Sequence, residues 1–179
     1  MDADTVNRFK ELAKDPAFLS EMKEVFFDAM MAGYASATKV QKATIVELPG
    51  SKLAPPYERG PWLVVDPYLV TPMSSYSGGM TVILYERMPV WMMQYYGSYP
   101  AEAIPCLKAA LRETYSKRQF FGGRGPTNHF SFGEFYYLNE IDDGYRNQRD
   151  HFKLFAGSEW VGHRNAKVGW HMYKGGLML

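Results

Sequence analysis

Hydrophobic residues in the first 33 positions recur at the three- and four-residue spacing of an α-helix. Asp15 and Pro16 favour a second helix start inside this segment, because aspartate caps free backbone N–H groups and proline is tolerated in the first turn. Gly33 favours a helix end, because glycine adopts the left-handed backbone of a C-terminal cap at little cost. Residues 1–33 are therefore expected to form two N-terminal helices.

Beyond Gly33 the pattern changes to short β-branched and aromatic segments that are separated by Gly, Pro and Asp. One helical pattern interrupts them at 100–117, where Ile104, Leu107 and Leu111 share a face. Residues 86–88 are expected to form the turn of a hairpin. The expected strands are 44–48, 62–65, 79–85, 89–96, 135–140, 152–155, 159–161 and 168–173.

Two of these stretches are imperfect copies of each other at one constant spacing in the chain. The matched pairs are Gly79 and Gly157, Val90 and Val168, Tyr95 and Tyr173, and Gly97 and Gly175. The repeat predicts a first β-unit over 44–97 and a second over 133–176, joined by the helix 100–117. We expect a single α+β domain, 1–179, with an antiparallel sheet from the two units and the N-terminal helices packed on it.

The two copies differ at three pairs of positions, which are Trp91 and Gly169, Met93 and His171, and Thr81 and Glu159. Side chains alternate across a strand, so Trp91, Met93 and Tyr95 should share one face of the sheet. A glycine within a strand indicates a bulge or the close approach of another group. The loss of a tryptophan at Gly169 leaves two interpretations open, asymmetric packing or a cavity.

The composition limits the classes of function. Hydrophobic residues make up 46% and charged residues 22%, with a net charge of +1, which is typical of a globular protein. Lys and Arg are not clustered, so no nucleic-acid partner is expected. No apolar run or N-terminal signal suggests a membrane span or secretion, and the single Cys106 excludes an intramolecular disulfide. The expected location is the cytoplasm.

Aromatic residues reach 16% of the chain, which favours a sheet and leaves material for an aromatic-walled pocket. We expect a ligand-binding or interaction domain rather than an enzyme, with no catalytic residue, metal or cofactor. The ligand would lie between the two β-units. The predicted ligand-binding residues are Trp62, Tyr95, Arg124, Tyr136, His171 and Tyr173.

Two alternatives remain open. His163, His171 and Glu159 could converge across one strand pair as a zinc or iron site, which would make the protein a small metal-assisted hydrolytic enzyme. Exposed edge strands could instead pair two copies into a structural homodimer. Arg124 also lies in the glycine-rich connector 121–126, whose composition resembles an anion-binding loop, although it follows a helix instead of preceding one.

Several short segments occur in a characteristic order, namely Tyr34-Ala35, Pro49 to Lys52 with Tyr57, Gly79 to Val82, Val90-Trp91, Tyr95 to Gly97, Arg124 to Pro126, Phe135 to Glu140, and Tyr173 to Gly176. Over roughly 17–179 they resemble an uncharacterised bacterial domain family, domain of unknown function 5680. Its members often follow a helix-turn-helix domain of the XRE type, so the resemblance implies a sensor or interaction role. The segment before Gly33 is too short for a complete helix-turn-helix domain, so DNA binding is not carried over, and the resemblance supplies no catalytic residues.

Overall fold

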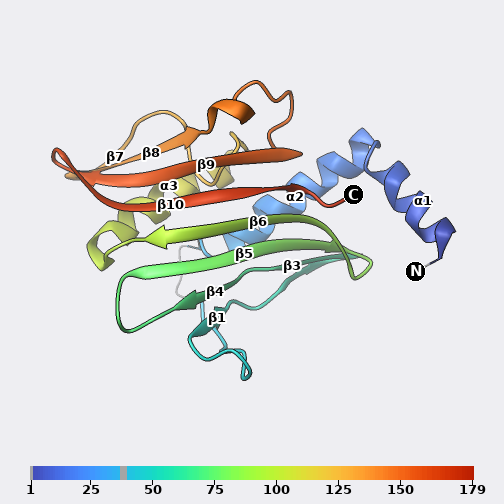
Figure 1. The fold of residues 1–179 in the computed structure, drawn as a ribbon, viewed down its shortest axis with the longest axis horizontal. Helices are drawn as coiled ribbons and strands as arrows, with labels where there is room; N and C mark the ends of the chain where they lie inside the picture. The colour runs from blue at the N-terminus through green and yellow to red at the C-terminus, as the bar shows by residue number, and fades with distance from the viewer. Residues whose placement is uncertain (1, 37–39) are drawn as a thin grey trace.

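The computed structural model describes residues 2–36 and 40–179. In these residues one antiparallel sheet of ten strands is combined with three α-helices, two N-terminal and one in the middle, so the fold is α+β as predicted (Figure 1). The α-helices are α1 (Ala3–Leu12), α2 (Pro16–Ala32) and α3 (Ile104–Ser116). The strands are β1 (Ser51–Leu53), β2 (Tyr57–Arg59), β3 (Trp62–Val65), β4 (Pro67–Val70), β5 (Tyr76–Tyr85), β6 (Met88–Ser98), β7 (Phe130–Phe132), β8 (Phe135–Ile141), β9 (Leu154–His163) and β10 (Ala166–Leu177). Two short 3-10 helices, η1 (Ala101–Ala103) and η2 (Asp143–Tyr145), precede α3 and follow β8.

The second N-terminal helix, α2, begins and ends at the residues that the sequence predicts. The Asp15 side chain accepts a hydrogen bond from the backbone N–H of Ala17 at 2.8 Å, and Pro16 occupies the first turn of α2. At the other end the Gly33 N–H donates to the Ala29 carbonyl at 2.8 Å. The predicted N-terminal cap is thus confirmed, whereas Gly33 ends the helix with a φ of −97° and not with the left-handed backbone that was expected.

The hairpins β5–β6 and β9–β10 meet at the centre of the sheet, where β6 pairs antiparallel with β10. Along the sheet the order is β1-β4-β5-β6-β10-β9-β8-β7, and β3 pairs with both β2 and β5. The central register places Tyr95 opposite Tyr173 and His171 opposite Gly97. Side chains from strands that are distant in the chain are therefore neighbours at this central pair.

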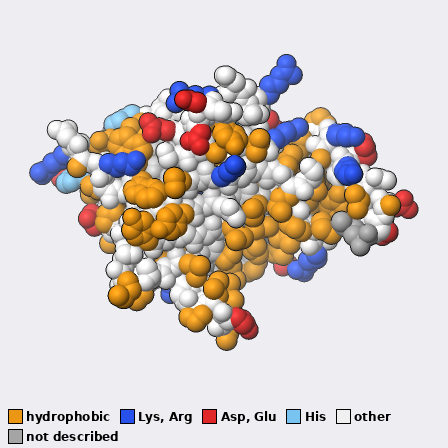
Figure 2. All heavy atoms as spheres, in the orientation of Figure 1, with side chains coloured by type: hydrophobic (Ala, Val, Ile, Leu, Met, Phe, Trp, Pro, Cys, Tyr) orange, Lys and Arg blue, Asp and Glu red, His pale blue; other side chains and the backbone are white. Residues whose placement is uncertain are grey.

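The two faces of the sheet have different surroundings, as the predicted alternation requires. The helices α2 and α3 lie behind the sheet in Figure 1 and cover the face that carries Trp91, Met93 and Tyr95, all of them buried. Phe26 of α2 packs edge-on against Trp91 at 5.2 Å between ring centroids. On the opposite face Tyr96 is exposed, and Figure 2 shows further hydrophobic side chains on this open face.

The predicted strand 44–48 is wrong. Only Ala43 forms an isolated bridge, to Leu53, and the chain then turns. The Ile45 N–H donates to the Ser51 hydroxyl at 2.7 Å, and the Leu48 N–H donates to the Ile45 carbonyl at 3.0 Å. These local hydrogen bonds hold a turn in which the β-branched residues have no neighbouring strand, so β propensity alone is not decisive. The sequence pattern did not predict the strands β1, β2, β4 and β7.

The segments 152–155 and 159–161, predicted as separate strands, belong mainly to one strand, β9. Gly157 lies inside it because the Tyr173 ring approaches so closely that an added Cβ would lie 2.5 Å from the Tyr173 hydroxyl. The glycine thus marks close packing rather than a break. No helix in the described part of the chain is long and apolar enough to cross a membrane.

Candidate functional site

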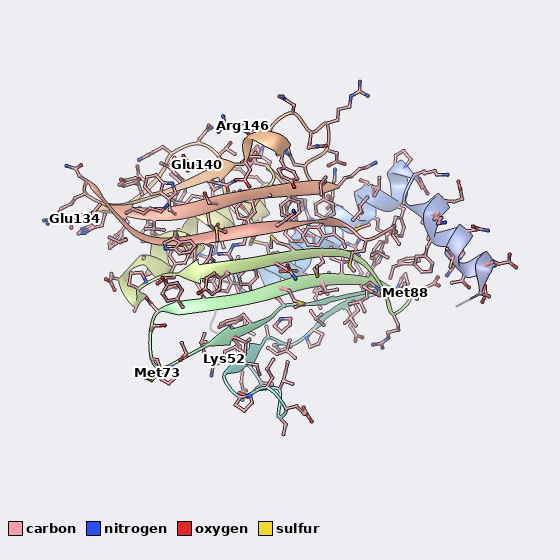
Figure 3. All side chains as sticks on the ribbon, in the orientation of Figure 1. Lys52, Met73, Met88, Glu134, Glu140 and Arg146 are labelled. Carbon is pink, nitrogen blue, oxygen red and sulfur yellow. The ribbon has the colours of Figure 1, made fainter. Side chains whose placement is uncertain are left out.

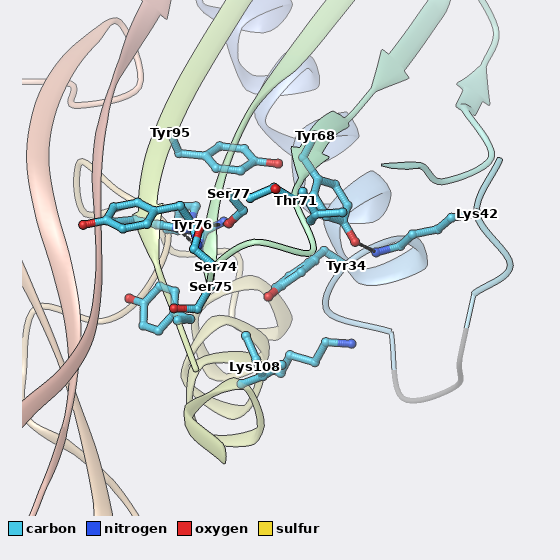
Figure 4. A pocket seen from close by; sticks show the side chains of 15 residues that line it. Tyr34, Lys42, Tyr68, Thr71, Ser74, Ser75, Tyr76, Ser77, Tyr95 and Lys108 are labelled. Carbon is cyan, nitrogen blue, oxygen red and sulfur yellow. Dashed lines mark hydrogen bonds between the residues drawn. The ribbon is translucent and has the colours of Figure 1, made fainter. Parts of the chain in front are cut away.

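A cavity of about 400 Å³ opens at the end of the sheet where β5 begins and β6 ends, next to α3 (Figure 4). Its wall combines tyrosine rings, small hydroxyl side chains and three cationic side chains. No described residue of the wall is acidic. The lining residues that are used below are Tyr34, Lys42, Tyr68, Thr71, Tyr76, Ser77, Tyr95, Tyr99, Lys108, Arg124 and His171.

Arg124 and Glu159 form a buried ion pair beside this cavity. The Arg124 Nε lies 2.9 Å from Oε1 of Glu159, and Nη2 donates to the same oxygen. The other carboxylate oxygen accepts from the Tyr137 hydroxyl at 2.7 Å. Burial is the largest single influence and raises the pKa of Glu159, but the Arg124 charge and the contacts with His171 and Arg124 together lower it to about 2. Glu159 is therefore ionised, and both of its oxygens are engaged.

The position of Arg124 depends on the connector between α3 and β7. Asn139 of β8 donates from its amide nitrogen to the Gly125 carbonyl at 3.2 Å, which attaches the connector to the sheet. The guanidinium then lies 4.9 Å from the Tyr95 ring centroid and 5.8 Å from that of Tyr34. Such cation–π contacts favour the charged form in a desolvated place. Tertiary contacts, and not a local motif, place this arginine.

His171 on β10 lies between the ion pair and the cavity. Its Nδ1 is 3.1 Å from Nη2 of Arg124 and 3.5 Å from Oε1 of Glu159, while its Nε2 is 3.3 Å from the Ser77 hydroxyl. The Tyr99 ring packs edge-on against the imidazole at 4.7 Å. Burial lowers the pKa of His171, so the imidazole is neutral near neutral pH.

Tyr95 is held by a carboxylate on the far side of the cavity wall. Its hydroxyl donates to Oδ1 of Asp66 at 3.2 Å, and the Thr81 hydroxyl donates to the same oxygen at 2.8 Å. Desolvation raises the pKa of Asp66, and burial raises that of Tyr95 well above its ordinary value. The Tyr95 ring is therefore fixed by its hydrogen bond and remains protonated.

Three cations surround the Tyr34 ring. Lys42 Nζ lies 5.5 Å, Lys108 Nζ 5.1 Å and the Arg124 guanidinium carbon 5.8 Å from its centroid. Figure 4 shows the two lysines reaching the cavity from separate segments, with Lys42 bonded to the Tyr68 hydroxyl at 2.7 Å. Burial and the nearby Lys42 charge lower the pKa of Lys108. Positive charge is therefore concentrated here without a carboxylate in the wall.

Three of the six predicted ligand-binding residues, Tyr95, Arg124 and His171, come together at this cavity. The other three do not line it. Trp62 is buried 5.0 Å from Phe18 of α2, Tyr136 stacks on His129 at 5.1 Å, and the Tyr173 hydroxyl donates to Asn139.

The predicted trio of His163, His171 and Glu159 is not assembled. His163 bonds instead to Glu134 at 3.3 Å, and Figure 3 shows Glu134 at the outer tip of the sheet. Within the described residues no group of three or more His, Cys, Asp and Glu side chains could hold a metal ion. His171 and Glu159 meet instead at Arg124, whose guanidinium is the cationic partner of the carboxylate.

Sequence reasoning missed several lining residues. Tyr99 continues the alternation of Tyr95 and Gly97 beyond the predicted end of the strand, so the periodicity could have found it. Lys108 follows Ile104 by one helical turn, and both line the cavity. Lys42 lies in an irregular segment, and no local pattern points to it.

The fold and the cavity define an α+β domain with a tyrosine-walled, cationic pocket on the helix-covered side of an antiparallel sheet. The chain belongs to the family described as Domain of unknown function (DUF5680), which matches residues 71–178. The match covers β5 to β10 and therefore includes Ser77, Arg124 and His171, whereas Tyr34 and Lys42 precede it. No curated protein and no solved structure matches the chain.

Proposed function

We propose that the protein binds a small molecule in the tyrosine-walled cavity and acts as a sensor-like binding domain rather than as an enzyme. The observation that carries the proposal is the meeting of Tyr95, Arg124 and His171 around a cavity of about 400 Å³. This volume falls in the range of roughly 300–1,000 Å³ that is typical of small-molecule sites. Aromatic walls with a few fixed polar groups are the usual composition of such sites.

The rigidity of the wall supports binding. Tyr95 is held by Asp66, Arg124 by Glu159, and His171 by contacts with Arg124 and Ser77. A wall that is ordered before the ligand arrives loses little side-chain entropy on binding. The cavity is therefore preorganised for a ligand.

The geometry favours binding over the metal-assisted enzyme. That alternative needs His163 beside His171 and Glu159, and His163 is bonded to Glu134 at another place in the sheet. The homodimer, the cytoplasmic location and the bacterial origin of the family stay predictions. Light scattering of the purified protein measures the oligomeric state.

Binding is tested by NMR with a fragment library on the wild type, on Thr71→Trp and on Tyr96→Ser. Thr71 is exposed and lies at the cavity, so the indole should fill the pocket, whereas Tyr96 is on the open face. We expect hits that shift the signals of Tyr99 and His171, that disappear in Thr71→Trp and that persist in Tyr96→Ser. Hits that persist in Thr71→Trp, or a library without hits, would contradict the proposal.

We also infer that the two hairpins are copies of one β-unit. Two parallel contacts support this inference. Tyr95 on β6 donates to Asp66 next to β3, and the matching Tyr173 on β10 donates to Asn139 of β8. The two tyrosines also face each other across the central strand pair.

A further inference from the structure

The hydrogen bonds around Arg124 show which groups are donors and which are acceptors, and this pattern limits the kind of ligand that the cavity can bind. Both oxygens of Glu159 already receive bonds, from Arg124 and from Tyr137. The carboxylate next to the cavity is thus satisfied by the protein. Glu159 is also fully buried and does not line the cavity, so it presents no acceptor to a ligand there.

The same arginine sets the tautomer of His171. A guanidinium carries only donors, so the 3.1 Å contact between Nη2 of Arg124 and Nδ1 of His171 is a hydrogen bond in the tautomer whose Nδ1 is unprotonated. The 3.5 Å separation between Nδ1 and the Glu159 carboxylate is too long to compete with this bond. The proton of the neutral imidazole is therefore on Nε2, from which it is donated to the Ser77 oxygen at 3.3 Å.

This tautomer excludes a familiar catalytic interpretation. Ser77, His171 and Glu159 stand in the spatial order of a serine–histidine–acid triad. In such a triad the histidine atom next to the serine is unprotonated and takes the hydroxyl proton. Here that atom holds a proton, so His171 cannot act as a base towards Ser77. The Ser77 hydroxyl hydrogen is left available to a ligand.

Further donors belong to residues that line the same cavity. The hydrogen bonds of Arg124 to described residues use Nε and Nη2, and Nη1 is not among the buried polar atoms that lack a partner, so it can donate to a ligand or to water. The Tyr99 hydroxyl is buried and has no hydrogen-bond partner among the described residues. Lys42 and Lys108 add two positive charges beside Tyr34, and none of the described lining residues is a carboxylate that could neutralise them. A buried donor without an acceptor costs free energy, so a ligand that supplies an acceptor would stabilise this wall.

We propose that the ligand is a small aromatic acid, whose oxyanion is received by Arg124, Ser77 and the two lysines and whose planar body packs against the tyrosine rings. The proposal rests on the proposed function, because it assigns a chemical class to the molecule that the cavity binds. Charge-assisted hydrogen bonds from Arg and Lys are the strong contacts for carboxylate, sulfonate and phosphate oxygens. The rings of Tyr34, Tyr68 and Tyr95 supply flat apolar surface around them.

The test uses two fluorescent probes that differ by one anionic group, anilinonaphthalenesulfonate and the neutral N-phenylnaphthylamine. Each probe is titrated into the wild type, Lys42→Met/Lys108→Met, Thr71→Trp and the control Lys174→Met, which removes an exposed lysine outside the cavity. Lysine variants are preferred over Arg124 variants because loss of Arg124 would leave the buried Glu159 charge unpaired. Thermal melts verify that each variant is folded, and Tyr96→Ser removes probe binding at the open face.

We expect the anionic probe to bind the wild type at least about tenfold more tightly than the neutral one, from one or two charge-assisted contacts. This preference should disappear in Lys42→Met/Lys108→Met and persist in Lys174→Met. Equal binding of both probes, blocked by Thr71→Trp, would overturn the aromatic acid and leave the binding cavity intact. Binding of both probes that Thr71→Trp does not change would overturn the cavity itself.

Discussion

The β5–β6 and β9–β10 hairpins lie side by side in one sheet but present different chemistry to its covered face. At matching positions the first hairpin carries Thr81 and Met93, and the second carries Glu159 and His171. Met93 is part of the hydrophobic core, whereas Glu159 and His171 are buried with Arg124 next to the cavity. The difference teaches that one backbone arrangement supports a core on one side and a polar site on the other.

The third difference concerns the side chain that fills the space of the lost tryptophan. Trp91 fills the first hairpin and stacks on Phe152 at 4.8 Å. Its counterpart, Gly169, leaves space for the Tyr99 ring, which then contacts His171 and lines the cavity. Of the two interpretations of the lost tryptophan, the contacts at Gly169 itself favour asymmetric packing, because the Tyr99 ring fills the space and Gly169 does not line the cavity.

The largest contrast is expected between Glu159→Gln and Thr81→Val. Glu159→Gln leaves the buried Arg124 charge unpaired, which should lower the free energy of unfolding by about 3–5 kcal/mol. Thr81→Val removes one hydrogen bond to Asp66, but Asp66 keeps its hydrogen bond from Tyr95. The free energy of unfolding should therefore fall by only about 1 kcal/mol. Urea unfolding measures both. Equal losses would show that the two positions have equivalent roles.

A methyl group at Gly169 should have the next largest effect. In Gly169→Ala the new carbon would lie 2.4 Å from Cδ1 of Tyr99, so the ring must move, at a cost of about 1–3 kcal/mol. Gly144→Ala is the control, because an added carbon there meets no atom within 4 Å. Unfolding in urea gives the cost, and probe fluorescence reports the change in the cavity. Unchanged probe binding in Gly169→Ala would show that Gly169 has no influence on the cavity.

The two matched tyrosines should have similar stability effects and different binding effects. Tyr95→Phe and Tyr173→Phe each remove one hydrogen bond and should each cost about 1 kcal/mol. Only Tyr95 lines the cavity, so only Tyr95→Phe should change the affinity for the anionic probe. Denaturation and titration of both variants measure the two effects. A change of affinity in Tyr173→Phe would mean that the hairpins share the site.

The smallest effect is expected when the pH dependence of stability is compared between the wild type and His171→Met. This variant places in the second hairpin the residue that the first hairpin has at the matching position, Met93. Burial lowers the pKa of His171 from 6.5, so the unfolded state binds more protons below that pH and the wild type loses stability as the pH falls. The free energy of unfolding of His171→Met should not change as the pH first falls below 6.5. Both proteins should still lose stability between pH 4.5 and about 2, where Glu159 is protonated first in the unfolded state.

Desolvation raises the pKa of Asp66, so the protonation of Asp66 makes the folded state more stable as the pH falls. Both proteins contain Asp66 and share this effect. The comparison of the two pH profiles therefore isolates His171. Unfolding experiments at a series of pH values measure them. Parallel profiles down to pH 5 would contradict a neutral, buried His171.

Much of the fold was predictable because its signals are local. The capping residues Asp15 and Gly33 delimit α2, and strand alternation assigns Trp91, Met93 and Tyr95 to one face. The segment 44–48 failed because β propensity does not provide a partner strand. Half of the predicted ligand-binding residues line the cavity, and Trp62 does not, because a large aromatic residue is equally suited to a hydrophobic core.

The sequence by itself determined the helices, the hairpins, the side-chain alternation and the positions at which the two similar stretches differ. Those features depend on backbone geometry and on neighbours a few residues apart. Only the tertiary structure decided that Lys42, Lys108 and Arg124 surround one tyrosine ring. They come from an irregular segment, a helix and a connector, and their meeting depends on the pairing of β6 with β10 and on the packing of α3 against the sheet. No local pattern encodes such long-range neighbours.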